Sequence, residues 1–224
     1  MTEEKVDNLK KIQNISETDV TTIQEMGRLI KENTNVSQVL NYVESKSFSW
    51  KTIVYLLKTT FETNFFEKSI LIKALINKTK DKNKILSHLI YKNPNIFFKV
   101  VSEGDVELLN FILNSNNSFV EIKDSENRNA LFYAMNSPFS TKRFEIMSCL
   151  IEAGIRYFNL GIYLDEVENL EGNTPLTYAA CKLLINDVKF LLENNASINH
   201  KNNKGIRFLM QDYLLYFMQS LITQ

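Results

Sequence analysis

The sequence predicts an all-α fold, a short helical solenoid that follows an N-terminal run of amphipathic helices. Apolar residues recur at helical spacing along most of the chain. Glycine and proline are scarce, 6 and 3 of 224 residues, which disfavours a β fold rich in turns. One helix–loop–helix pattern also returns along the second half of the chain, as it does in stacked repeats.

Residues 1–92 are expected to form a region of short helices joined by polar segments. Ser49 is a good N-cap, and Ile70 is counted among the inward apolar residues of its helix. Residues 78–84, KTKDKNK, predict a charged connector. Short helices need neighbours for stability, so these should pack on one another. The expected helices are a frayed one within 1–16, then 16–33, 36–46, 49–61, 65–78 and 85–90.

The clearest unit lies at residues 171–196, where a tight turn, a short helix, a loop and a second helix are expected. Gly172 allows the positive φ that such a turn needs. Thr174 is a good N-cap, and Pro175 suits the first helical position. Neither helix is long enough to be stable alone, so the unit requires copies of itself on either side.

These residues resemble an ankyrin repeat. The family pattern is matched by Thr174-Pro175-Leu176, by the pair Ala179-Ala180 and by Leu191-Leu192, while Thr177 stands where the family has histidine. The resemblance extends over about residues 93–224 and implies stacked helix pairs.

The small turn residue of each unit marks the period. Asn93, Asn127, Gly172 and Gly205 follow one another at intervals of 34, 45 and 33 residues. The long interval predicts two insertions, one within 137–141 and one in a loop within 157–167. The second helix of that unit is expected to end at about Ile151, before Gly154. The units expected are 93–126, 127–168, 169–201 and a degenerate terminal unit, 202–224.

Polar residues are expected to open each turn. Asp124, Asn169 and Asn202 each lie three residues before a turn residue, where their side chains can bond the local backbone.

Composition excludes several classes of partner. Lys and Arg total 26, as do Asp and Glu, so the net charge is zero and predicts no binding to nucleic acid or to an anionic membrane. The N-terminal MTEEKVDNLKK lacks the apolar core of a signal peptide. Buried, reduced thiols at Cys149 and Cys181 are expected in a reducing compartment. A cytoplasmic location follows from these features.

Motifs for catalysis, metal binding or cofactor binding are not apparent in the sequence. His88 is expected at the polar edge of a helix and His200 in a solvated turn. Asp165, Glu166 and Glu168 predict a solvated acidic loop, since they are sequence neighbours rather than opposite walls of a cleft. We expect no enzyme activity, no cofactor and no small-molecule substrate.

The resemblance implies that a partner protein binds the turn tips and the exposed side of each first helix. Tyr133 and Tyr178 hold the same register in adjacent units, so they are either interface anchors or packing residues. The apolar insertion at 157–163 either folds back on the stack or contacts a partner. The expected partner-binding residues are Arg128, Tyr133, Asn136, Tyr157, Phe158, Glu171, Asn173, Tyr178, Lys182 and Asn203.

Two functions remain open from the sequence. The first is a non-enzymatic protein–protein interaction module that uses the concave face of the repeats. The second is an adaptor or effector whose N-terminal helices recruit a second protein, such as a ubiquitin-ligase or host component. The resemblance implies both, and fold alone names no partner.

Overall fold

The structure is a computed structural model that describes residues 17–31, 35–63, 67–138, 140–158 and 162–205. These residues form eleven α-helices, α2 to α12, and two short 3-10 helices, η1 and η2, with no strand among them. The predicted all-α class is therefore confirmed. The chain divides into two compact units, residues 1–92 and residues 93–224.

The first unit is a set of short helices packed through their apolar stripes. Helix α2 packs on α3 and α4, while α5 packs on α3, α4 and α6. Each helix contributes aliphatic side chains that are fully buried, such as Met26, Val43, Leu57 and Leu75. The helices are α2 (Glu17–Lys31), α3 (Val36–Ser45), α4 (Trp50–Glu62), α5 (Lys68–Asn77) and α6 (Lys82–Lys92).

Local details of this unit confirm one prediction and correct two. Ser49 caps α4, because its Oγ accepts a hydrogen bond from Thr52 N at 3.2 Å. Ile70 is 45% exposed and does not face the core. The apolar run on α5 is wider than one face, and its buried residues are 71, 72, 75 and 76. The charged connector is shorter than predicted, since α6 already begins at Lys82.

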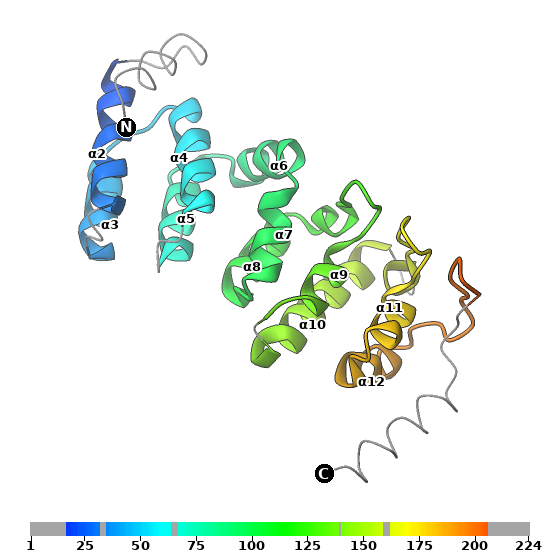
Figure 1. The fold of residues 1–224 in the computed structure, drawn as a ribbon. Helices are drawn as coiled ribbons and strands as arrows, with labels where there is room; N and C mark the ends of the chain where they lie inside the picture. Colours follow the sequence, from blue (N-terminus) through cyan, green and yellow to red (C-terminus); the bar gives the residue numbers. More distant parts are fainter. Residues whose placement is uncertain (1–16, 32–34, 64–66, 139, 159–161, 206–224) are drawn as a thin grey trace. The chain divides into compact units, whose positions relative to one another are not determined.

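The second unit arranges its helices in pairs (Figure 1). The first helices of successive pairs, α7, α9 and α11, pack on one another, and α8 packs on α10. Phe144 of α10 and Phe190 of α12 bring the second helices of the last two pairs together, with ring centroids 5.3 Å apart. The elements are α7 (Asn95–Ser102), α8 (Val106–Ser115), η1 (Asn117–Glu121), α9 (Ala130–Met135), α10 (Ser140–Phe158), η2 (Ile162–Asp165), α11 (Pro175–Cys181) and α12 (Ile185–Glu193).

Helix α10 is longer than predicted. It continues through Gly154 to Phe158, so Tyr157 and Phe158 belong to its last turn rather than to a loop. Gly154 does not stop the helix. It gives room to the buried Tyr163 of η2, since a Cβ at position 154 would lie 2.9 Å from that ring. This part of the insertion therefore folds back on the stack at Tyr163.

Parts of three predictions lie outside the described residues. These are the frayed helix within 1–16, the terminal unit beyond residue 205, and the side chains of Tyr157 and Phe158.

Candidate functional site

The predicted turn tips have the expected backbone conformation in three of four places. Asn127, Gly172 and Gly205 have φ values of 60°, 70° and 73°, the left-handed conformation that glycine and asparagine tolerate best. Asn93 is not among the positive-φ residues. It precedes Pro94, whose ring disfavours the helical conformations at the preceding residue. The first repeat therefore lacks a tip with positive φ.

Successive tips are joined by main-chain hydrogen bonds. Asn169 N donates to Glu126 O at 2.8 Å, and Asn203 N donates to Glu171 O at 2.9 Å. Main-chain groups make these bonds, so the bonds themselves do not require a particular side chain at either residue.

In the second repeat, the tip at Asn127 is held by Asp124, as predicted. Its Oδ1 accepts from Glu126 N and Arg128 N, both at 2.9 Å, and its Oδ2 accepts from Arg128 Nε at 2.7 Å and from the Tyr133 hydroxyl at 2.8 Å. Burial alone would raise the pKa of Asp124. The hydrogen bonds from Arg128, Tyr133 and Glu126 outweigh burial and lower the pKa below its ordinary value.

In the third repeat, Glu168 holds the tip in the same way. It lies one residue before the predicted Asn169. Glu168 is 3% exposed, and its N–H donates to Asn173 O just as Asp124 N donates to Arg128 O. Its carboxylate accepts from Leu170 N at 2.6 Å, Glu171 N at 3.0 Å and Asn173 N at 3.0 Å. This turn is one residue longer, and the extra methylene of glutamate lets the carboxylate span it.

The predicted solvated acidic loop is therefore wrong. Besides Glu168, Asp165 accepts from Ser197 N at 2.8 Å, and Glu166 pairs with Lys123 at 2.9 Å. These carboxylates satisfy buried or half-buried donors of neighbouring segments. Within the described ranges, no group of His, Cys, Asp or Glu side chains is placed to hold a metal ion.

Asn173 is the clearest error among the predicted binding residues. It is 1% exposed, its Nδ2 donates to Glu168 Oε1 at 3.1 Å, and its Oδ1 accepts from Asn202 Nδ2 at 2.9 Å. A partner cannot reach this amide, because it joins two adjacent tips from inside.

Three further expectations about single side chains were wrong. His200 is half-buried, and its Nε2 lies 2.6 Å from Gly172 O. Cys149 is half-buried and Cys181 is exposed, so neither thiol is in the core. His88 is exposed, as predicted.

The two tyrosines pack on phenylalanines of the preceding repeat. The ring of Tyr133 stacks on Phe98, with centroids 4.2 Å apart and planes 8° apart. Tyr178 meets Phe132 edge-on, with centroids 5.3 Å apart. Both rings are half-buried. The two tyrosines are therefore packing residues on one side of each ring, which was one of the two predicted roles.

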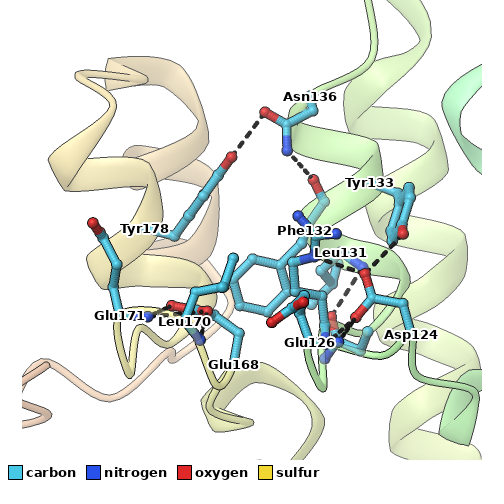
Figure 2. A network of polar contacts seen from close by, with 12 residues as sticks. Asp124, Glu126, Leu131, Phe132, Tyr133, Asn136, Glu168, Leu170, Glu171 and Tyr178 are labelled. Carbon is cyan, nitrogen blue, oxygen red and sulfur yellow. Dashed lines mark hydrogen bonds and ion pairs between the residues drawn. The ribbon is translucent and has the colours of Figure 1, made fainter. Parts of the chain in front are cut away.

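Tyr178 also reaches across the repeat boundary with its hydroxyl. The hydroxyl donates to Asn136 Oδ1 of the preceding unit at 2.9 Å, and Figure 2 shows the two side chains pointing toward each other. Lys182 places its ammonium 5.8 Å from the centroid of the Tyr178 ring. Asn136 and Lys182 are both exposed.

The tip beside Tyr178 carries charge and one apolar side chain. Glu171 forms an ion pair with Lys204, whose hydrogen bond lowers the pKa of the Glu171 carboxyl. Asn203 is exposed, and Arg128 of the preceding tip keeps a third of its side chain exposed. Leu170 is 62% exposed and was missed by the sequence analysis. Its signal was an apolar residue inside a polar turn.

No described helix has the length and apolar character required to cross a membrane. Comparison of the chain with curated proteins and with solved structures finds no significant match. A family model for ankyrin repeats matches residues 97–202 in three copies. The match coincides with the helix pairs and the hydrogen-bonded tips described above, and it confirms the resemblance of residues 97–202 to ankyrin repeats.

Proposed function

We propose that the chain is a non-enzymatic interaction module that binds a partner protein on the exposed side of its repeats. Ankyrin repeats are in general protein–protein interaction modules. The partner would contact what we call the repeat face, which consists of Asn136, Leu170, Glu171, Tyr178, Lys182 and Asn203.

One observation carries this proposal. Tyr178 is half-exposed, yet its hydroxyl is anchored on Asn136 of the neighbouring repeat and its ring lies beside Lys182. An ordered tyrosine with one open side gives a large contact area at low entropic cost. The exposed Leu170 adds an apolar contact at the adjacent tip.

The test uses one charge reversal on the repeat face and one away from it. Lys182→Glu changes the repeat face, while Lys189→Glu changes α12 at a side chain that is 72% exposed. Tagged full-length wild type and both variants are used for affinity purification, and the main captured protein is then purified and titrated. We expect Lys182→Glu to weaken binding about tenfold or more and Lys189→Glu to leave it unchanged. Equal affinities for all three proteins would contradict the proposal.

An adaptor is the second candidate, supported by the compact unit that residues 1–92 form apart from the repeats. In this function the N-terminal helices recruit a second protein, such as a ubiquitin-ligase or host component.

A further inference from the structure

Charge is unevenly distributed along the chain although the net charge is zero. Residues 46–92 contain ten lysines against three acidic residues, a net charge of +7, and no arginine. Residues 93–224 contain eleven basic and fifteen acidic residues, a net charge of −4. The neutrality of the whole chain therefore hides a strongly basic segment that attracts anionic partners.

An open groove lies inside the first unit, between α3 and α5, with a volume of about 430 Å³. Leu40 and Val43 of α3 and Ile70 and Ala74 of α5 form its apolar lining. Ile70 is 45% exposed in this concave site. A single exposed isoleucine is ordinary, but an isoleucine exposed inside an apolar groove is typical of a binding site.

Lysines border the groove. Lys73 and Lys78 line it together with Glu44 and Asn77. Lys78 Nζ donates to the main-chain oxygens of Glu44 at 2.7 Å and Lys46 at 3.2 Å. Both acceptors are neutral, and the carbonyl end of α3 offsets the ammonium only in part. Lys78 therefore holds a positive charge at a fixed position on the edge of the groove.

We propose that the α3–α5 groove binds an acidic amphipathic helix of a partner protein. A hydrophobic groove accepts the apolar face of an amphipathic helix, and the surrounding lysines attract acidic residues beside that face. Helices α3 and α5 contain 10 residues each, so each is about 15 Å long and matches two to three turns of a bound helix. This surface shares no residue with the repeat face, and the inference goes beyond the function proposed for the repeats.

Other anionic partners fit the groove less well. Arginine is the preferred residue for bidentate phosphate contacts, and residues 46–92 contain none. The exposed Trp50 has Lys84 over its ring at 5.9 Å and the His88 ring against it, which leaves little room for base stacking. A bilayer surface is flat and does not fill a concave floor.

The test is a titration of the full chain with a fluorescein-labelled helical peptide of about fifteen residues. The peptide carries leucines along one stripe and glutamates elsewhere, and a second peptide has lysine in place of every glutamate. Wild type is expected to bind the glutamate peptide, to lose affinity as salt is added, and not to bind the lysine peptide.

Matched variants locate the binding site. Ile70→Asp should weaken binding about tenfold or more, since it removes an apolar contact and adds a repelling charge. Ile155→Asp on α10, where the side chain is 44% exposed, should have no effect. Circular dichroism verifies that both variants are folded.

Several results would overturn the inference. One is the absence of saturable binding of the glutamate peptide at millimolar concentration. The others are binding of the lysine peptide as tightly as the glutamate peptide, and binding by Ile70→Asp as tightly as by wild type. Binding of phosphatidylserine vesicles or of a thymidine oligonucleotide in place of the glutamate peptide would likewise overturn it. Lys182→Glu should leave peptide binding unchanged, so failure here and failure of the repeat face are distinguishable.

Discussion

At the residue scale, the tips depend on buried carboxylates that accept main-chain N–H groups. Asp124 and Glu168 serve the same purpose in turns of different length. A buried N–H without a partner costs about 1 to 3 kcal/mol. Removing either carboxylate leaves several N–H groups without their acceptor at once.

Glu168→Ala should lower the free energy of unfolding by roughly 3 kcal/mol, because several donors lose their acceptor. Glu168→Asp should recover only part of this loss, since its side chain is one methylene shorter. Urea unfolding followed by circular dichroism measures both. Glu171→Ala is the control, because its side chain is 45% exposed and an exposed ion pair adds little to stability. Equal losses in Glu168→Ala and Glu171→Ala would contradict the role of Glu168.

Asp124 predicts a pH dependence. Its folded pKa lies below the ordinary value of 3.8, so the ionised carboxylate stabilises the fold. That contribution is complete above the unfolded pKa and is lost as the pH falls through the folded pKa. Wild type should therefore lose more stability than Asp124→Asn between about pH 6 and about pH 3. Urea unfolding of both proteins across this range measures the difference, and parallel curves would show that Asp124 is not the group responsible.

At the element scale, α10 shows how a glycine serves a neighbouring element rather than its own. Glycine inside a helix costs about 1 kcal/mol relative to alanine. Gly154 lies in α10 beside Tyr163, which is 3% exposed. The close approach of η2 to α10 therefore outweighs the lower helix propensity of glycine.

Gly154→Ala should destabilise the protein by about 1 to 3 kcal/mol, because its Cβ would overlap the buried Tyr163 ring. Gly27→Ala is the matched control. Gly27 lies in α2 with nothing within 4 Å of the added Cβ, so this change should stabilise by about 1 kcal/mol. Thermal unfolding of both variants tests the opposite signs. Stabilisation by Gly154→Ala would show that Tyr163 moves aside at little cost.

The sequence predicted caps and turns better than it predicted which face of a helix is buried or whether a turn side chain is exposed. The N-cap at Ser49 and the turns at Gly172 and Gly205 were correct, since local chemistry determines them. The environment of Asn173 could not be predicted, because a polar residue in a turn has the same local signal whether it bonds water or a buried amide. Ile70 was misplaced because the apolar run on α5 is wider than one helical face.

At the scale of the whole molecule, side-chain contacts join the last two helix pairs. Arg143 of α10 pairs with Asp187 of α12 at 2.9 Å, with side chains 17% and 2% exposed. Burial raises the pKa of Asp187, and Arg143 opposes that shift. Arg143 also donates to Ser137 O at 2.9 Å. This pair joins consecutive repeats, and stacked repeats owe much of their stability to such interfaces.

Breaking this pair on one side should cost more than removing it. Asp187→Leu leaves the Arg143 guanidinium without its partner and should cost about 2 to 4 kcal/mol. The double variant Arg143→Met, Asp187→Leu should recover most of that loss, because two apolar side chains can replace a buried pair. A double-mutant cycle from urea unfolding measures the coupling. Additive effects would indicate that the two side chains act independently.

The bonds between the tips bear on how repeats of this kind diverge. Asn169 bonds Glu126, 43 residues before it, and Asn203 bonds Glu171, 32 residues before it. Extra residues in α10 and η2 are thus accommodated without disturbing contacts made by backbone atoms alone. A repeat of this kind can therefore be lengthened between its tips while the alignment of the tips persists.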